Sequence, residues 1–472
     1  MKLGSVLRHS KRFASILSLS LVTSAQAASL RESIGSHKVL VLVVVLLAAA
    51  AVAAWLVSRR RYWQLAVLAA LGLVAATFYG RSKFLVRYPH AALSIERLKD
   101  SAAILLGTDM RLTRFDPRSM LVVEHKTVER AMYPAVDVHF HLESLPPNIT
   151  PERLIRAMDA TNVAKLINMG GTQEMFDRFA TTYHDRYPDR FVMFMKPDFD
   201  AVAKPGGVAE QVQWIDDAAR KGAVGIGEIN KSFGTAFRDP EGKLLKVDDP
   251  RLDPIWDEAG RLGLPVLIHT GDPPAFFLPV DEHNERYEEL SEFPEWSRSN
   301  PGDPTFEQLM TDREQLIAKH PRTIFIGAHI GSNEDDLAYA SHLLDKYPNY
   351  YVDMAARVAA LGREPYTARR FLIKYQDRVL FATDGGFGMA DTEPGWTAER
   401  YFRSHFEFLE TANEYIEYPQ WPLSQGRWRV YGVDLPPEVL EKIYAGNIER
   451  LLPTHAAIMA RLAGDSSAAP PP

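Results

Sequence analysis

The sequence predicts an α/β protein, a TIM (β/α)8 barrel preceded by an N-terminal transmembrane helical hairpin. Two long uncharged apolar runs predict the hairpin, and eight short β-prone runs that alternate with helix-like segments predict the barrel. In addition, histidines and carboxylates stand at the ends of several of these runs. Strands alternating with helices form parallel sheets, and eight such units are the number that closes a barrel.

The N-terminal region is typical of a membrane anchor. Residues 1–27 combine a basic start, a short apolar run and the sequence AQA, which indicates a secretory signal segment with cleavage near Ala27. Residues 39–57 are apolar and uncharged, and a helix of that length spans roughly 28 Å, close to the thickness of a bilayer's hydrocarbon core. Residues 62–79 form a second candidate span after the basic sequence SRRR. We therefore expect an anchor in the inner membrane.

The charge distribution bears on orientation and partners. The first 90 residues carry twelve Lys and Arg against one Glu, a net +11, so the remainder carries −17 of the overall −6. If the signal works, Arg59–Arg61 stay in the cytoplasm and the body faces outward, as the positive-inside rule favours; if it does not, the other basic residues keep the body inside. We expect a periplasmic or extracytoplasmic body. Its acidic charge argues against nucleic acid as a partner.

The remaining chain divides into a connecting arm (88–130), the barrel (131–455) and a tail that composition predicts to be disordered (456–472). Cysteine is absent, which excludes disulfides, thiolate nucleophiles and Cys-containing zinc sites. An open doubly wound sheet is the alternative fold, but it would carry a Gly-rich turn after its first strand, where this chain has His-x-His. The predicted strand runs are 135–142, 163–171, 190–199, 223–230, 264–272, 323–331, 349–355 and 379–386.

The first run, AVDVHFHL, has two chemically different faces. Side chains alternate along a strand, so Val136, Val138 and Phe140 are expected to face the helices. Asp137, His139 and His141 are then expected to face the barrel interior, with Asp137 supporting the site and the histidines acting as ligands.

Further polar residues end other strands: Glu228 on the fourth, His269 on the fifth, His329 on the sixth and Asp384 on the eighth. In a barrel these ends converge on one rim, where active sites are built. Each residue also has a structural interpretation, such as a hydrogen-bonded histidine, a turn aspartate or half of a buried ion pair. Together they predict a divalent metal site, since imidazole and carboxylate bind zinc and similar ions without a thiol.

The motifs DVHFHL, GEIN, IHTGDP, GAHIG and FATDGG, closing with IYAGNIERLL, resemble the amidohydrolase superfamily over about residues 130–453. The branch that they resemble is the amidohydrolase-related group with aminocarboxymuconate-semialdehyde decarboxylase. The resemblance implies a barrel with zinc, as one or two ions, held by His139, His141, His269 and Asp384. It also implies that His329 is a catalytic acid/base or a ligand of a second ion. Glu228 would bridge two ions, as in two-metal hydrolases of the TatD type; decarboxylase-like members do not generally use such a ligand.

Three functions follow as hypotheses. The first is a membrane-anchored, metal-dependent hydrolase in which metal-activated water attacks a carbonyl, amide or lactone-type small substrate, with Asp384 and His329 handling protons. The second is a zinc-dependent decarboxylase of a carboxylated small molecule. The third is a non-catalytic barrel scaffold, which the complete ligand set disfavours. Lys196 and Arg357 are candidate partners of a substrate carboxylate, and a homo-oligomer is also compatible with the sequence.

Overall fold

The computed structural model describes residues 119–145, 148–202, 204–239, 241–386, 397–418, 425–426 and 428–464. The predicted signal segment, both predicted membrane spans and most of the connecting arm lie outside these residues. Within them, no helix is both long and apolar enough to cross a membrane. The chain divides into two compact units, Met1–Leu121 and Val122–Pro472, and the barrel belongs to the second.

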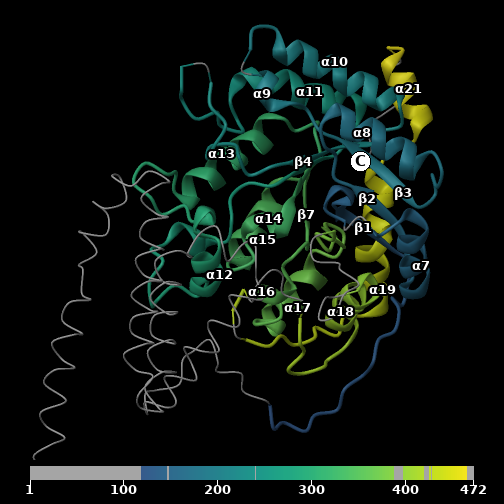
Figure 1. The fold of residues 1–472 in the computed structure, drawn as a ribbon, viewed down its shortest axis with the longest axis vertical. Coiled ribbons are helices and arrows are strands. Elements are labelled where there is room, and N and C mark those ends of the chain that lie inside the picture. The colour runs from purple at the N-terminus through teal and green to yellow at the C-terminus, as the bar shows by residue number, and fades with distance from the viewer. Residues whose placement is uncertain are drawn as a thin grey trace, which may run out of the picture. The chain divides into compact units, whose positions relative to one another are not determined.

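Eight parallel strands form one sheet in sequential order, as predicted. The first and last strands are joined by hydrogen bonds from Val138 N to Phe381 O (3.1 Å) and from His141 N to Gly385 O (2.8 Å), so the sheet closes into a barrel (Figure 1). The strands are β1 (Ala135–Phe140), β2 (Val163–Asn168), β3 (Phe191–Met195), β4 (Gly225–Ile229), β5 (Val266–Ile268), β6 (Phe325–Gly327), β7 (Tyr350–Asp353) and β8 (Val379–Leu380).

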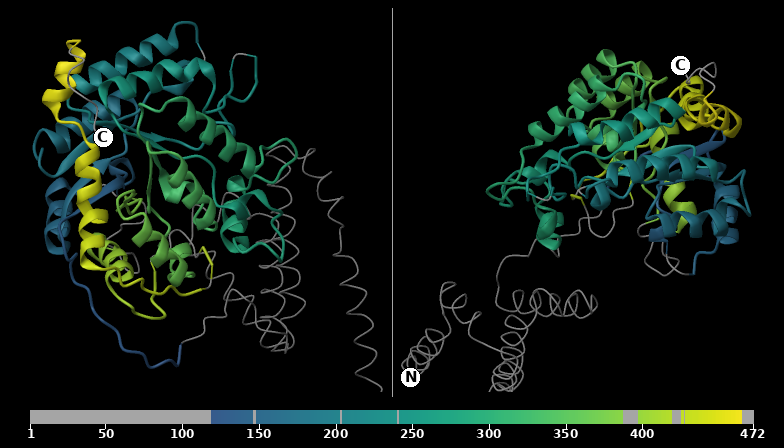
Figure 2. Two further views of the ribbon diagram at one scale, coloured as in Figure 1. Left: turned by 180° about the vertical axis from the view of Figure 1, so that it is seen from behind. Right: turned by 90° about the horizontal axis from the view of Figure 1, so that it is seen from above.

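Helices surround the strands (Figure 2). Their ends follow local signals: Thr305 and Gln308 form a capping box at the start of α13, and Gly263 ends α11 at φ 68°. The helices are α7 (Pro151–Thr161), α8 (Gln173–Phe179), α9 (Phe199–Val202), α10 (Gly207–Arg220), α11 (Asp253–Leu262), α12 (Tyr287–Glu292), α13 (Phe306–Lys319), α14 (Ala328–Ser332), α15 (Leu337–Lys346), α16 (Val358–Leu361), α17 (Pro365–Lys374), α18 (Ala398–Glu410), α19 (Pro437–Glu441), α20 (Asn447–Leu451) and α21 (His455–Leu462).

The start of the predicted disordered tail is corrected by α21, which begins at His455 and is capped by the Thr454 side chain. Ile458 is fully buried, and the Arg461 Nη1 group donates to Leu262 O at 2.5 Å. The short sequence AAIMARL therefore docks on the barrel, and this tertiary contact overrides the compositional signal for disorder that follows it.

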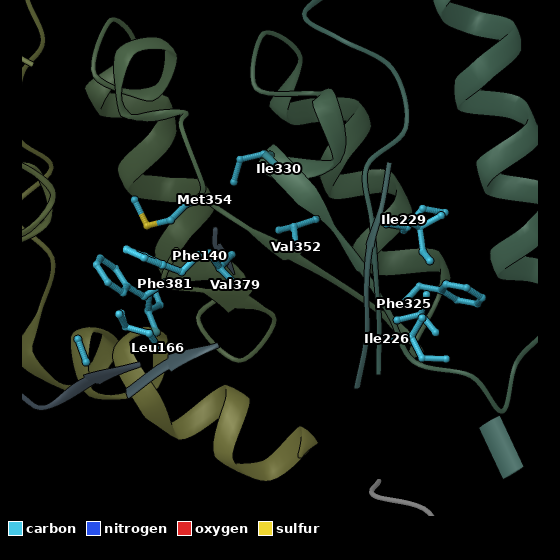
Figure 3. Packing of buried hydrophobic residues seen from close by; sticks show 14 of the residues in the cluster. Phe140, Leu166, Ile226, Ile229, Phe325, Ile330, Val352, Met354, Val379 and Phe381 are labelled. Atoms are coloured by element: carbon cyan, nitrogen blue, oxygen red, sulfur yellow. The ribbon is translucent and has the colours of Figure 1, made fainter. Parts of the chain in front are cut away.

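The hydrophobic core has two parts. The larger cluster lies between the strands and the helices, and Figure 3 shows part of it, including Phe140, Leu166 and Phe325. The smaller cluster comes mostly from strand residues that alternate with those of the larger cluster, such as Ile167 and Ile326. It therefore fills the barrel interior, as layered side chains do in this fold.

A β-bulge in β1 corrects the predicted orientation of three residues. Asp137 pairs with Leu166 and Phe140 with Asn168, so three steps along β1 match two along β2. The extra residue reverses the alternation. Val136 and Val138 consequently face the barrel interior and belong to the interior cluster. Asp137 is paired with Leu166, whose side chain faces the helices, and so also faces outward. After the bulge, His139 and His141 point inward as expected.

Candidate metal centre

His139 and His141 are each oriented by a carboxylate. The Nδ1 of His139 lies 2.9 Å from Asp353 Oδ2, and the Nδ1 of His141 lies 2.8 Å from Glu143 Oε1. Donating Nδ1–H to a carboxylate leaves Nε2 as the ligand atom, which is the arrangement that metal-binding histidines commonly adopt. Both rings of the His-x-His pair are therefore prepared to bind through Nε2.

The two Nε2 atoms face two further carboxylates. Asp384 Oδ1 lies 3.6 Å from the Nε2 of His139 and 3.2 Å from that of His141. Glu228 Oε2 lies 4.0 Å and 3.7 Å from the same two atoms. The Nε2 of His139 is buried and has no hydrogen-bond partner among the described residues. Two imidazole nitrogens and two carboxylate oxygens thus surround one point, and this donor set fits a divalent ion.

A second group adjoins the first and shares Glu228 with it. Glu228 Oε1 lies 2.5 Å from the Nδ1 of His269, and the rings of His269 and His329 have centroids 4.3 Å apart. One ligand atom from each of these three residues lies within 4.8 Å of the others. Glu228 therefore presents Oε2 to the His-x-His pair and Oε1 to His269.

Backbone conformation places Asp384 and the glycines after it. Asp384 has φ 61°, in the left-handed region, and its N–H donates to His139 O at 3.0 Å. Gly386 has φ 115°, and a Cβ there would lie 2.2 Å from His141 O. Glycine is required at position 386 because the chain after β8 passes directly against the metal-binding end of β1.

The electrostatics favour a cation at this site. Burial lowers the pKa of His139, but the nearby Asp353, Asp384 and Glu228 carboxylates outweigh that effect and raise it to about 9. Burial raises the pKa of Asp384, whereas the surrounding histidines hold it well below its usual value, so this carboxylate is ionised. Ionised carboxylates that gather around ring nitrogens are compensated when a divalent ion binds among them.

His329 differs from the other histidines. Burial, together with the Arg357 guanidinium, holds its pKa well below the usual value, so the ring is neutral. Its Nδ1 donates to Ala355 O at 2.8 Å, which leaves Nε2 to exchange protons. The Asp384 side chain is 25% exposed.

The structure thus brings His139, His141, Glu228, His269, His329 and Asp384 together at one rim of the barrel. Arg357 follows β7, is buried, and places Nε 2.6 Å from Glu334 Oε1. Lys196 follows β3 and is half-buried; within the described part of the chain, no hydrogen bond or ion pair joins its ammonium to the site. The substrate roles of Lys196 and Arg357 stay predictions.

Sequence reasoning missed two carboxylates beside the site, Asp353 and Glu143. Asp353 lies near the end of the predicted run 349–355 and is the last residue of β7, so the rule that identified Asp384 would also have identified Asp353. Glu143 follows His141 by two residues, but nothing local predicted its hydrogen bond. Asp137 was expected to support the site rather than bind the metal. It accepts hydrogen bonds from Thr383 N (3.0 Å) and Oγ1 (2.6 Å), directly before Asp384, and burial raises its pKa to about 7.

Comparisons with known proteins identify the family of this chain. A family model described as amidohydrolase matches residues 136–454, and no curated protein matches the chain. A dihydroxybenzoic acid decarboxylase from Polaromonas sp. JS666, with bound manganese, is 16% identical, covering 68% of this chain and 97% of its own at a TM-score of 0.40. The 4-oxalomesaconate hydratase of Rhodopseudomonas palustris is 14% identical, covering 71% and 99% at 0.41. An uncharacterised TIM-barrel protein of Bordetella bronchiseptica is 15% identical, covering 70% and 99% at 0.40. Similarities this weak assign no activity.

Proposed function

Because the chain belongs to the amidohydrolase family, we propose that it is a metal-dependent hydrolase acting on a carbonyl, amide or lactone-type small substrate. The observation that carries the proposal is the position of Glu228. One of its oxygens faces the His-x-His pair and the other faces His269, as a carboxylate shared by two ions would. The nitrogen and oxygen donors suit zinc, which we propose as the metal.

The chain's own residues would act on the water and the substrate. A divalent ion bound here would lower the pKa of a water to about 7 and polarise the substrate carbonyl. Asp384 is ionised and partly exposed, so its carboxylate can accept the proton of the attacking water. The proton that Asp384 takes from the water can then pass to the leaving group, either directly or through the unprotonated Nε2 of the neutral His329.

A decarboxylase is the second candidate, and one contact favours it. The hydrogen bond between Glu228 and the Nδ1 of His269 repeats the carboxylate pairing seen at His139 and His141. If Glu228 only orients His269, a single ion would be held by the histidines and Asp384. An ion held there would polarise a carboxylated substrate, and a protonated side chain of the site would supply the proton that replaces the departing CO2 on carbon.

Metal content per chain, measured by elemental analysis on the full chain, tests the two candidates. About two ions that fall to about one in Glu228→Gln would support the shared carboxylate. One ion that is lost in His139→Ala but kept in Glu228→Gln would favour the decarboxylase. No metal after reconstitution would refute both. Glu152→Gln, at an exposed carboxylate, is the matched control. The products then distinguish the two reactions: a hydrolase incorporates ¹⁸O from labelled water into its product, whereas a decarboxylase releases CO2.

We also propose that residues 39–57 and 62–79 anchor the protein in the inner membrane with its body in the periplasm. The absence of cysteine makes this testable, because a single introduced thiol is then unique. Tyr366 lies on α17 and is 79% exposed. Tyr366→Cys should react with a membrane-impermeant maleimide in intact bacterial cells. Labelling only after lysis would place the body in the cytoplasm.

A further inference from the structure

The backbone at His329 is unusual and must be held in place. Four consecutive residues have left-handed conformations: His329 (φ 61°), Ile330 (φ 55°), Gly331 (φ 64°) and Ser332 (φ 55°). Only glycine adopts this region freely, and a β-branched residue such as Ile330 is strongly disfavoured there. Such a turn persists only where surrounding contacts determine it, and it is characteristic of functional positions.

One buried carboxylate holds the start of this turn. Asp353 is fully buried at the end of β7, and its Oδ1 accepts hydrogen bonds from His329 N (2.8 Å) and Ala355 N (3.0 Å). Its other oxygen, Oδ2, lies 2.9 Å from the Nδ1 of His139. Asp353 therefore joins the ligand histidine of β1 to the backbone of the histidine after β6.

The far end of the turn is held by other groups. The Arg313 side chain donates to Gly331 O, and the Asn333 side chain donates to the same oxygen at 2.6 Å. Neither group is hydrogen-bonded to the first residue of the turn. The His329 ring is fixed separately, by donating its Nδ1–H to Ala355 O at 2.8 Å. The backbone N–H of His329 therefore has Asp353 as its hydrogen-bond acceptor.

Asp353 lies close enough to His139 and His329 to be considered a metal ligand with them. However, both of its carboxylate oxygens are already engaged in these hydrogen bonds. We infer that Asp353 is a positioning residue, whose single carboxylate fixes His139 toward the metal and His329 toward the substrate. The first half rests on the proposed metal site. In the second half, the hold on the His329 turn rests on the backbone hydrogen bond alone, and the orientation of His329 toward a substrate rests on the proposed function.

Two substitutions at Asp353 separate its effect on His139 from its effect on His329. In Asp353→Asn, the amide oxygen can still accept from the N–H of His329, but the amide nitrogen would oppose the Nδ1–H of His139. The His139 ring then loses its preferred tautomer while the turn is kept. In Asp353→Ala both connections are lost. Glu143→Gln is the matched control, because Glu143 orients His141 and has no described contact with His329.

The test measures zinc affinity by chelator competition and hydrogen exchange of peptides spanning residues 328–333, on the full chain. Losing such a partner costs a metal site about 10- to 100-fold in affinity. We expect that loss in all three variants, but faster exchange at His329 only in Asp353→Ala. The d–d absorption of the Co²⁺-loaded protein should shift in Asp353→Asn, a signature that a purely structural role would not produce.

Wild-type zinc affinity in a folded Asp353→Asn variant would overturn the first half of the inference. Unchanged exchange in Asp353→Ala, or equally faster exchange in Glu143→Gln, would overturn the second half. If the wild-type chain binds no zinc, the proposed function fails, while the exchange experiment still decides the role of Asp353 at His329. If Asp353→Ala does not fold, the comparison is made between Asp353→Asn and Glu143→Gln. Faster hydrogen exchange of residues 328–333 in Asp353→Asn would then overturn the claim that the amide oxygen preserves the turn.

Discussion

The buried His405 is expected to make the protein unstable in mild acid. His405 lies on α18, is fully buried, and has its ring against Tyr401 and Phe381. Burial lowers its pKa from 6.5 to about 4, which the hydrogen bond between its Nδ1 and Tyr401 O only partly offsets. The native state therefore keeps the ring neutral at a pH where the unfolded chain is already protonated.

The direction of the pH dependence of stability follows from which state of the protein binds the proton more tightly. Stability contributed by neutral His405 is fully present above pH 6.5, the unfolded value, and falls as the pH drops toward 4. With these two pKa values, the loss is about 2 kcal/mol at about pH 5 and approaches roughly 3 kcal/mol at lower pH. His405→Phe keeps a ring in the same aromatic cluster and removes the titrating group.

Urea unfolding followed by tryptophan fluorescence, at about pH 7.5 and about pH 5, measures this effect. The free energy of unfolding of the wild type should fall by about 2 kcal/mol more than that of His405→Phe over this interval. The exposed His283 provides the control, since His283→Gln should follow the wild type. Equal losses in the wild type and His405→Phe would refute the reasoning, as would a smaller loss in the wild type.

Two other predictions concern the site and the turn beside it. Zinc at about 100 times its Kd should raise the free energy of unfolding by about 2.7 kcal/mol, measured by urea unfolding; His139→Ala should lose this gain, and an equal gain in that variant would contradict the ligand assignment. Ser332→Gly should stabilise the protein by about 1 kcal/mol, because Ser332 has φ 55° and its buried Oγ has no partner among the described residues. Ser341→Gly, inside α15, should instead cost about 0.5 kcal/mol, and thermal unfolding that ranks the two variants the other way would contradict this.

The barrel was predictable from the sequence because its signals are local. Each strand is a short apolar run, the longer helices are amphipathic, several of them begin at a capping side chain such as Thr150 or Thr305, and sequential strand order follows from short connections. The convergence of His139, His269, His329 and Asp384 was also predictable, since the carboxyl ends of parallel strands meet at one rim. The residue types at those ends then indicated a metal.

Other features were decided by contacts between distant parts of the chain. Strict alternation placed Asp137 inward, whereas a bulge reverses the faces of β1 and lets Asp137 bond to Thr383, 246 residues away. Asp353 likewise forms a hydrogen bond with His139, which lies 214 residues away in the sequence.

The sequence by itself therefore determined the fold class and which strand ends carry the chemistry, because periodicity and composition are local properties. Only the tertiary structure decided which nitrogen each histidine presents, that Glu228 faces two groups, and that His329 lies in a left-handed turn. Each of these depends on a hydrogen bond or close contact between segments that only the closed barrel brings together.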